Sequence, residues 1–364
     1  MKFFFFLKLI INQLIIIPFY IPAFFVNFFI RLLHPIVVIR FGQLSRRIGH
    51  FTANAEIILC ERKLKKINNT KKTIDIFCVA KVPNIQIAKM YKRAGIYLAP
   101  FYIVYPIIKI NKLLPYNDAF DFNESKFSQS DRDIDHLFDK INTQISFISN
   151  EISESKKILK SLGVNENKKI ICLMIRDDNY LREYLGGNWN YHDYRNYKLE
   201  NFYPAIRELL NKGYIVFRMG KFAKERININ HKNFFDYPFL NQKSDLLEVY
   251  LSSICEFCVT TSSGFDAIPY IFRKPLAILH VPVGIFWTFN KKYITITKHH
   301  YSKDLKRNLT LHEIFKSNLA YALKTSDFSD KNIELIDNSS DEILNLVIEM
   351  HNYIKNKNIS EQKE

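Results

Sequence analysis

Apolar residues along this chain fall into short blocks whose spacing alternates between that of a strand and that of a helix. The run Ile36–Arg40 is continuous, as in a buried strand, and apolar positions at helical spacing follow from Phe51 to Leu59. Residues 74–80 predict a second strand, residues 87–93 predict a second helix, and further apolar runs lie at 96–99 and 103–110. Such alternation is typical of an α/β domain with a parallel sheet.

A polar stretch at about 117–133 separates this block from a second series of strands and helices. The second series has predicted strands at 169–175, 214–218, 276–279 and 293–296, and predicted helices at 148–162, 199–212, 245–252, 311–315 and 341–353. The pattern therefore predicts two α/β domains, at 36–150 and 151–325, followed by a C-terminal helix and tail at 326–364.

Residues 3–33 are almost wholly apolar, which predicts that segment 1–35 is a membrane anchor or an interfacial hydrophobic segment. The length suits a bilayer span, but Pro18 and Pro22 interrupt it. Basic residues follow, from Arg31 to Arg47, so the positive-inside rule places the rest of the chain in the cytoplasm. The alternative is a helix buried in the core, which phenylalanines on every side of the helix disfavour.

The chain has 364 residues, with 52 Lys and Arg against 36 Asp and Glu, and so carries a formal net charge of +16. This excess favours anionic partners such as nucleotides or a membrane surface. The basic residues are spread along the chain and form no recognisable nucleic-acid-binding module, so nucleic acid is not an expected partner. Five cysteines indicate a reducing compartment. Cys255 and Cys258 lack the second pair, or the histidine, that a zinc site needs.

The stretch from Cys258 to Leu279 predicts a strand, a small-residue turn, a helix and a second strand. The turn is Ser262-Ser263-Gly264, at the start of the predicted helix. Free backbone amides at such a position commonly hold a phosphate. The alternative is a well-capped helix without a ligand, with a serine as N-cap and Asp266 in the first turn.

Three loops of the second half follow predicted strands, and we expect all three at one edge of the sheet. An arginine fork, a lysine point charge and a helix N-terminus together neutralise a diphosphate without a metal ion. The structural alternatives are an ion pair between Arg176 and Asp177, and a surface position for Arg218. The predicted donor-binding residues are Arg176, Asp177, Arg218, Gly220, Lys221, Ser262, Ser263, Gly264 and Asp266.

Motifs for other phosphate or metal chemistry are missing from the sequence. It contains no P-loop, no complete GxGxxG fingerprint after a strand, and no HExxH. Asp177 and Asp178 are adjacent carboxylates, but neighbouring residues at a strand end point to opposite sides. We therefore expect no metal ion and no cofactor.

In the first half, a loop with Arg46, Arg47 and Gly49 joins the first strand to its helix. His50, at the start of that helix, is the candidate base because imidazole has a pKa near neutral, and Glu56 is a second candidate. The alternative is a capping or packing histidine. In the second half, the long aromatic and polar segment 179–198 suits a cover over a sugar or nucleotide. The predicted acceptor-binding residues are Arg46, Arg47, Gly49, Asn54, Tyr180, Arg195 and Asn196.

Several of these motifs, in their order and spacing over residues 36–290, resemble a family of bacterial glycosyltransferases associated with surface-polysaccharide assembly. They are Arg46–His50 with Glu56, Ile175–Asp177 with Tyr180, Asp193–Asn196, Gly213–Gly220 and Ser262–Pro269. The resemblance implies a two-domain glycosyltransferase of the B type, with two Rossmann-like halves facing each other. It implies that the C-terminal half binds a nucleotide-sugar without a metal ion, and that the terminal helix at 341–353 packs back on the first domain.

Residues and resemblance together support the hypothesis of a metal-independent glycosyltransferase at the cytoplasmic face of a bacterial inner membrane. The enzyme would move a sugar from a nucleotide-sugar to a surface-polysaccharide or lipid-linked saccharide acceptor. Ser262, Ser263 and Gly264 would hold the diphosphate, Arg218 and Lys221 would stabilise its departing charge, and His50 or Glu56 would take the acceptor's proton. The alternatives are another polysaccharide-modifying transferase, pyruvyl or phosphoryl, and a non-catalytic scaffold on the same fold.

Overall fold

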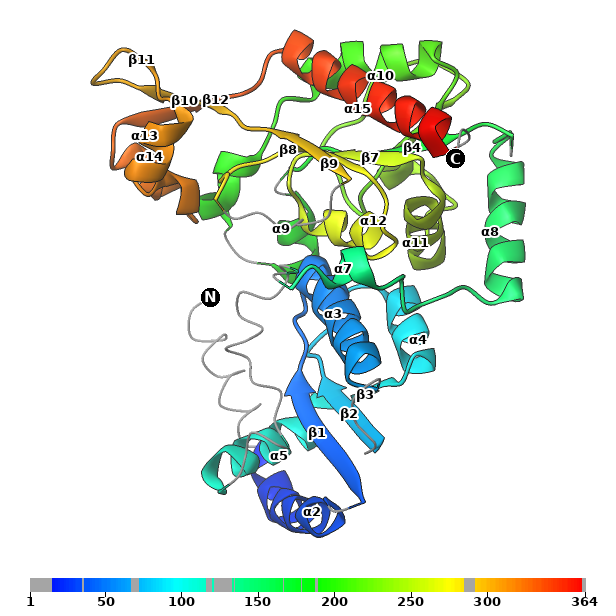
Figure 1. Ribbon diagram of the computed structural model, residues 1–364, viewed down its shortest axis with the longest axis vertical. Coiled ribbons are helices and arrows are strands. Elements are labelled where there is room, and N and C mark those ends of the chain that lie inside the picture. The colour runs from blue at the N-terminus through cyan, green and yellow to red at the C-terminus, as the bar shows by residue number, and fades with distance from the viewer. Residues whose placement is uncertain are drawn as a thin grey trace. The chain divides into compact units, whose positions relative to one another are not determined.

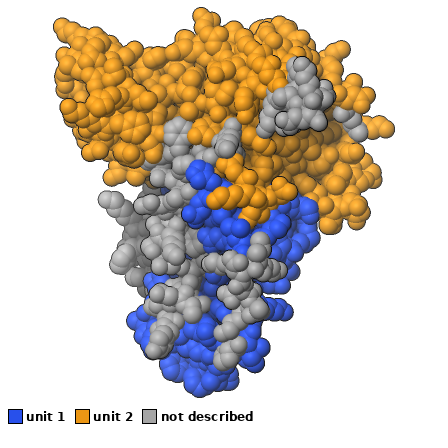
Figure 2. Space-filling view, viewed as in Figure 1, with its two compact units in different colours: residues 1–137, 143–146 blue, residues 138–142, 147–364 orange. Residues whose placement is uncertain are grey.

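A computed structural model describes residues 15–34, 36–66, 72–115, 120, 133, 135–165, 167–177, 179–186, 189–284 and 292–361. The chain divides into two compact units, the first being Met1–Leu137 with Thr143–Ser146 and the second Phe138–Asn142 with Phe147–Glu364 (Figure 2). Residues 3–14 of the predicted membrane segment, most of the polar stretch at 117–133, and Asp178 lie outside the described residues.

The first unit is built on a parallel sheet in the order β1-β2-β3 (Figure 1). Its strands are β1 (Val37–Gln43), β2 (Lys72–Cys78) and β3 (Ile96–Ala99), and the connecting helices are α3 (Ile48–Lys66) and α4 (Ile85–Arg93). Arg62 of α3 forms an ion pair of 2.5 Å with Asp75 of β2, which fastens that helix to its face of the sheet. The predicted alternation of strands and helices is confirmed.

The opposite side of this sheet is covered by α2 (Tyr20–Leu33) and α5 (Phe101–Leu113), and the short helix η1 (Ile17–Phe19) precedes α2. The apolar run at 103–110 is therefore helical. The reason is visible in its spacing, since the buried positions Val104, Ile107, Ile108 and Asn111 recur with the period of a helix. On α2 the buried positions Ala23, Asn27 and Ile30 form one stripe, and this stripe packs against α5 and β1.

The remaining sides of α2 are apolar and exposed, with Ile21 at 71% and Phe29 at 58%. None of the helices within the described residues is both long enough and apolar enough to cross a bilayer. The described part of the predicted membrane segment, residues 15–34, contains η1 and the 14-residue helix α2, and it belongs to the first unit.

The second unit contains a six-stranded parallel sheet in the order β6-β5-β4-β7-β8-β9. Its strands are β4 (Ile170–Met174), β5 (Ile215–Arg218), β6 (Phe234–Asp236), β7 (Phe257–Thr260), β8 (Leu276–Leu279) and β9 (Tyr293–Ile296). Renumbered within the unit, this is the doubly wound order 3-2-1-4-5-6. The direction of winding reverses between β4 and β7, and ligands of such sheets bind beyond the carboxyl ends of the strands at that reversal.

Helices cover both faces of this sheet (Figure 1). The helices in this part of the chain are α8 (Ser149–Ser161), α9 (Asn179–Leu185), α10 (Tyr203–Asn211), α11 (Asp245–Ile254), α12 (Ala267–Ile271) and α15 (Ser340–Glu361), with α7 (Leu137–Lys140) and the short helices η3 (Asn190–Arg195), η4 (Leu199–Phe202), η5 (Tyr237–Phe239) and η6 (Gly264–Asp266). The buried face of α15, from Ile343 to Ile354, belongs to the core of the second unit together with α10. This face of α15 therefore packs on the sheet of its own unit. Packing of the helix on the first domain, which the resemblance implied, stays a prediction.

A small antiparallel sheet beside the main one was not predicted. Its strands are β10 (His299–Ser302), β11 (Arg307–Asn308) and β12 (Ile333–Ile336), and α13 (Leu311–Lys316), η7 (Leu319–Tyr321) and α14 (Thr325–Ser329) pack with it. These strands, HHYS, RN and IELI, are short and rich in polar or charged residues, so they lack the apolar run that identified strands of similar length in the main sheet.

Candidate functional site

The reversal point of the second unit's sheet is closed by two hydrogen bonds between the ends of β4 and β7. The backbone amide of Arg176 donates to Oγ1 of Thr261 at 2.7 Å, and the amide of Thr261 donates to the carbonyl of Met174 at 3.1 Å. Both residues are buried, with Arg176 at 7% exposure and Thr261 at 1%. The side chain of Arg176 is therefore placed at the position where doubly wound sheets bind ligands.

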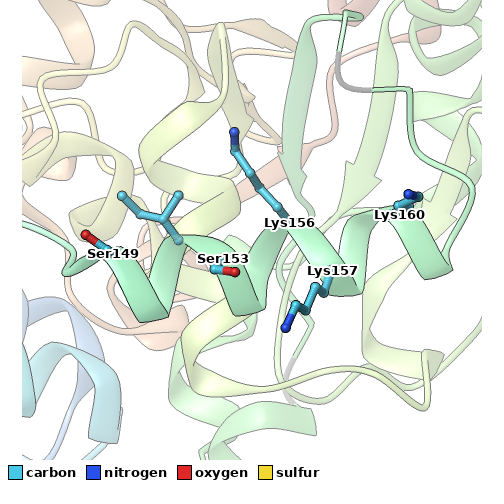
Figure 3. Close-up of a pocket in the computed structure, with 6 residues that line it drawn as sticks. Ser149, Ser153, Lys156, Lys157 and Lys160 are labelled. Carbon is cyan, nitrogen blue, oxygen red and sulfur yellow. The ribbon is translucent and has the colours of Figure 1, made fainter.

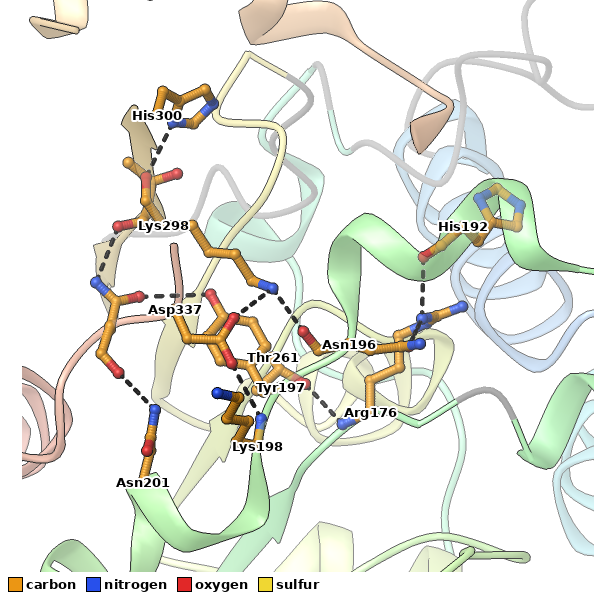
Figure 4. Close-up of polar contacts among 12 residues, drawn as sticks. Arg176, His192, Asn196, Tyr197, Lys198, Asn201, Thr261, Lys298, His300 and Asp337 are labelled. Carbon is orange, nitrogen blue, oxygen red and sulfur yellow. Dashed lines mark hydrogen bonds and ion pairs between the residues drawn. The ribbon is translucent and has the colours of Figure 1, made fainter. Parts of the chain in front are cut away.

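The guanidinium of Arg176 is held by the segment that follows α9 (Figure 4). Nη1 donates to the carbonyl of His192 at 3.1 Å and to Oδ1 of Asn196. Among the described residues, Nη2 and Nε of Arg176 have no acceptor in the protein. Burial, with a smaller contribution from the positive charge of Arg195, lowers the pKa of Arg176 to about 10. The side chain therefore stays charged at neutral pH.

Two further cations lie near Arg176. Nζ of Lys298 forms an ion pair of 2.7 Å with Asp337, donates to the carbonyl of Asn196 at 2.5 Å, and lies 4.2 Å from the ring centre of Tyr197 (Figure 4). Burial lowers the pKa of Lys298, and the charge of Arg176 adds to this, while the Asp337 carboxylate opposes it.

Arg195, the second of these cations, is half-buried and has no carboxylate partner among the described residues. Its Nε donates to the hydroxyl of Tyr194 at 3.0 Å. The mutual repulsion of Arg176, Arg195 and Lys298 is a cost that a bound anion would relieve. This edge of the sheet is therefore electrostatically suited to a phosphate or diphosphate.

The turn after β7 is tightly bonded within itself. Ser262 has a left-handed backbone, with φ of 57°, and Ser263 caps the following short helix by accepting from the amide of Phe265 at 3.2 Å. Asp266 accepts from the amide of Ser263 at 2.8 Å and from the hydroxyl of Thr260. The fully buried Asp266 has its pKa raised to about 7 by burial, against the opposing effect of these hydrogen bonds.

This turn thus forms the capped helix that the sequence offered as an alternative, with Ser263 as the N-cap and Asp266 in the first turn. The amides of Ser263 and Phe265 already have acceptors, and Asp266 supplies one of them. Ser262, Ser263, Gly264 and Asp266 lie together at the end of β7, as the sequence suggests. Direct donor contacts from this group remain a prediction.

Arg218 is turned inward at the end of β5, with an exposure of 1%. Its Nη1 donates to the carbonyl of Glu225 at 2.5 Å and contacts Asp236 at 3.3 Å, while its Nη2 lies 3.8 Å from Asp177. Asp177 also accepts from the amides of Asn179 and Lys224, each at 3.0 Å. In this arrangement Arg218 and Asp177 fasten neighbouring loops, and their donor contacts remain a prediction.

The loop after β5 contains the two other candidates of this group. Gly220 has φ of 124°, a conformation that residues with a side chain rarely adopt. Nζ of Lys221 pairs with Asp245 at 3.0 Å and lies 5.8 Å from the ring centre of Tyr184. On the adjacent helix α9, the ring of Tyr180 stacks on Tyr184 with centroids 5.4 Å apart.

The hydroxyl of Tyr180 is buried, and no described residue accepts from it or donates to it. Burial, followed by the charge of Glu248, raises the pKa of this hydroxyl. It stays protonated and is available as a donor.

The first unit carries the candidates for acceptor chemistry at the carboxyl end of β1. Arg46 is exposed, Arg47 is half-buried, and Gly49 is buried in the first turn of α3. His50 and Asn54 are four residues apart on α3 and so lie on the same side of the helix. Oδ1 of Asn54 is buried and has no partner among the described residues, which leaves an acceptor open beside His50.

Glu56, the second candidate base, is fully buried inside the first unit. Its Oε1 accepts from the amide of Gln144 at 2.8 Å and thereby holds the segment at 143–146. A carboxylate in this position supports the unit's structure, so His50 is the better placed of the two for contact with a substrate.

Sequence reasoning missed three polar residues at the reversal point. Thr261 lies within the stretch Cys258–Leu279, but the turn predicted there begins only at Ser262. Lys298 follows the predicted strand at 293–296, so the rule that identified Arg176 would also have found it. Asp337 directly follows β12, and because β12 is not predicted from the sequence, the same rule could not identify Asp337.

Neither the basic side of α8 nor any cluster of metal-ligating side chains adds to this site in the described part of the chain. A shallow pocket of about 490 Å³ is lined by Ser149, Ile152, Ser153, Lys156, Lys157 and Lys160 (Figure 3). All six residues belong to α8, so this is the basic, solvated side of one helix. No group of three or more His, Cys, Asp or Glu side chains is placed to hold a metal ion in the described ranges.

Comparison with known proteins was made by sequence and by structure. No protein-family model and no curated protein matches the sequence. The crystal structure of a glycosyl transferase family 9 protein from Veillonella parvula is similar with a TM-score of 0.51 at 10% identity, over 85% of this chain and 97% of that chain. The structure of E. coli ADP-heptose LPS heptosyltransferase II aligns with a TM-score of 0.44 at 12% identity, over 86% and 98%.

The similarity to the Veillonella structure spans both units and nearly the whole length of that protein. The chain therefore has the two-domain, B-type glycosyltransferase fold, and the prediction of two Rossmann-like domains is confirmed. The membrane segment before them stays a prediction.

Proposed function

We propose that this protein is a glycosyltransferase that moves a sugar from a nucleotide-sugar donor to a saccharide acceptor of a bacterial surface polysaccharide. The observation that supports this most is the buried, charged Arg176 at the reversal point of a doubly wound sheet. The fold similarity to a family 9 glycosyl transferase supports the same class of reaction.

The donor's diphosphate would occupy the carboxyl edge of β4 and β7, beside Arg176 and Arg195. Arg176 has two nitrogen donors without a protein acceptor, and Arg195 has no carboxylate partner among the described residues. Arginine binds phosphate oxygens through paired hydrogen bonds, and these strengthen as charge develops on the leaving group. Lys298 would contribute through its field, because its Nζ is occupied by Asp337 and Asn196.

In the reaction, the oxygen of an acceptor hydroxyl forms a bond to the anomeric carbon of the donor sugar. The bond between that carbon and the diphosphate oxygen breaks, and its electron pair leaves with the nucleoside diphosphate. The hydroxyl proton passes to the imidazole of His50, the type of side chain that most often acts as a general base. Asn54, with its open Oδ1, would accept a hydrogen bond from the acceptor saccharide.

We place the reaction at the cytoplasmic face of the bacterial inner membrane, with a lipid-linked saccharide as the acceptor. The exposed apolar side of α2 and the chain's net charge of +16 support association with an anionic bilayer surface. Arg46 and Arg47, next to His50, suit an acceptor that carries a phosphate.

The decisive experiment compares ligand binding by the wild type and by Arg176→Gln. A thermal-shift panel of nucleotide-sugars and free nucleoside diphosphates is measured with magnesium and with EDTA, because a ligand of the native state raises its stability. One nucleotide class should raise the melting temperature, and the shift should survive EDTA. R176Q should weaken that ligand about tenfold or more, the equivalent of a lost charge-assisted hydrogen bond.

The matched control is Arg207→Gln, which removes an exposed arginine from α10. R207Q should bind the donor like the wild type. A shift seen only with magnesium would contradict metal-independent transfer. A shift with another anionic donor class but with no nucleotide-sugar would favour a different polysaccharide-modifying transferase, and unchanged affinity in a folded R176Q would remove Arg176 from the donor site.

A further inference from the structure

A second pocket lies in the first unit, between α2 and the residues that follow α5, and none of its lining residues has a role in the site described above. It has a volume of about 590 Å³, in the range of small-molecule sites. Its apolar walls come from Phe24 and Phe28 of α2, from Leu114 and Pro115 after α5, and from Phe120. Two side chains capable of positive charge, Arg31 and His34, complete the lining.

Arg31 is the unusual member of this lining. One nitrogen, Nη2, donates to Oδ1 of Asn111 at 2.7 Å, and the guanidinium lies 4.6 Å from the ring centre of Phe120. Its Nε is buried and has no acceptor, and no carboxylate forms an ion pair with it in the described part of the chain. Burial also lowers the pKa of Arg31. A cation in an apolar pocket with an unsatisfied donor indicates that an anionic group belongs there.

His34 extends the polar end of the pocket. It follows Arg31 by three residues at the end of α2, and its ring lies against Phe120 with centroids 5.1 Å apart. The C-terminus of a helix disfavours a nearby anion, so the cationic side chain of Arg31 must supply the attraction here.

The pocket opens on a surface that is suited to the interface of a bilayer. On α2, the side chains of Phe25, Phe29 and Leu32 are more than half exposed, at 55%, 58% and 60%, and Leu113 at the end of α5 is 82% exposed. The surfaces of soluble proteins rarely expose so many large apolar side chains together. A helix with such a face lies in the plane of the interface, and this brings the pocket to the level of the lipid phosphates.

We propose that this pocket binds one anionic phospholipid of the membrane surface. The lipid's phosphate accepts hydrogen bonds from Arg31 next to His34, and its acyl region packs on Phe24, Phe28 and Phe120. The lipid supplies an anionic partner for Arg31 and also covers the apolar walls of the pocket. A free phosphate would leave the walls uncovered, and an uncharged lipid would leave Arg31 without an anion. This proposal rests on the membrane association given under the proposed function, and it does not depend on how the nucleotide-sugar donor binds.

The test measures binding of soluble short-chain phosphatidylglycerol to the full-length protein by calorimetry, below the lipid's micelle concentration and without nucleotides. Wild-type protein should bind one equivalent, and short-chain diacylglycerol, which lacks the phosphate, should bind at least about tenfold more weakly. Arg31→Gln should weaken phosphatidylglycerol by a similar factor. Lys112→Gln, which removes an exposed charge from the end of α5, should change it by less than about twofold because exposed charges are screened.

A second variant separates binding from folding. Phe28 is 53% exposed and lies three residues before Arg31, so Phe28→Glu should leave the melting temperature unchanged while its carboxylate repels the phosphate. Equal binding of both lipids, or undiminished binding by a folded F28E, would overturn the proposal. Binding only after residues 1–14 are removed would also overturn it, because the chain itself would then be the occupant. Since no nucleotide is present, failure here leaves the donor-site test unaffected.

Discussion

The backbone amide of Arg176 donates to Oγ1 of Thr261 at 2.7 Å, which joins the ends of β4 and β7 where the winding of the sheet reverses. The two residues are 85 positions apart in sequence. The bond fixes the start of the Arg176 side chain, and the bonds from Nη1 to His192 and Asn196 fix its end. A site for a charged ligand is thereby held in place before any ligand arrives.

Thr261→Val should test this relationship directly. Valine keeps the shape of threonine but removes the acceptor, which leaves the Arg176 amide buried and unpaired. We expect a loss of about 2 kcal/mol in the free energy of unfolding by urea. The matched control is Thr297→Val, because Oγ1 of Thr297 is buried without a partner among the described residues. T297V should cost less than about 0.5 kcal/mol or stabilise the protein. Equal losses in the two variants would show that the Arg176–Thr261 bond contributes nothing specific.

Asp337→Asn should leave the buried cation of Lys298 without its counter-ion. The expected loss is about 3 kcal/mol, since breaking a buried ion pair leaves one charge uncompensated. Glu334→Gln provides the comparison, because Glu334 pairs with Lys303 at the surface. The side chain of Lys303 is 61% exposed and that of Glu334 is 56% exposed. Removing the exposed pair should cost less than about 0.5 kcal/mol. Urea unfolding of both variants decides the matter, and a small effect of D337N would mean that Asn196 and the Tyr197 ring suffice to hold Lys298.

The buried Asp266 should make stability depend on pH with a definite sign. Its pKa in the folded protein is raised to about 7, above the value of about 4 for an unfolded chain, so the folded state holds the proton more tightly. Its contribution to the free energy of unfolding is therefore greatest near pH 4 and falls as the pH rises to about 7. Unfolding measured across this range should show that Asp266→Asn has a flatter profile than the wild type.

Thr260→Val provides a check on the cause of this pH dependence. The Thr260 hydroxyl donates to the Asp266 carboxylate and so favours its charged form. Removing this donor should move the midpoint of the pH profile upward. A downward shift, or a wild-type profile as flat as that of D266N, would assign the titration to another group.

The strands of the second unit were largely determined by local sequence. Leu276–Leu279 and Tyr293–Ile296 form strands with the predicted bounds, because short apolar runs between turn residues can be buried on both faces of a parallel sheet. The position of Arg176 directly after such a run also marked it as a site candidate. These features depend on residues a few positions apart, which a pattern along the chain records.

Other decisions depended on packing between distant segments. The run at 103–110 suits a strand or a helix, and its packing on α2 and the sheet selects the helix. Arg218 is the last residue of β5 and Arg176 lies just beyond β4, so both lie at carboxyl ends of strands, yet Asp236 and the carbonyl of Glu225 turn the guanidinium of Arg218 inward. Only the three-dimensional neighbours of each arginine distinguish the two, because an arginine side chain turns toward whichever acceptors surround it.

The sequence by itself determined the two α/β units, the strand ends that supply cations, and the apolar character of the N-terminal helix. The tertiary structure alone decided the strand order that creates the reversal point, the arrival of Lys298 and Asp337 beside Arg176, and the side of α2 that is buried. The physical reason is the sequence distance over which each interaction acts. Backbone propensity and hydrophobic period act over one element, whereas strand order and burial of charge depend on contacts between elements many residues apart.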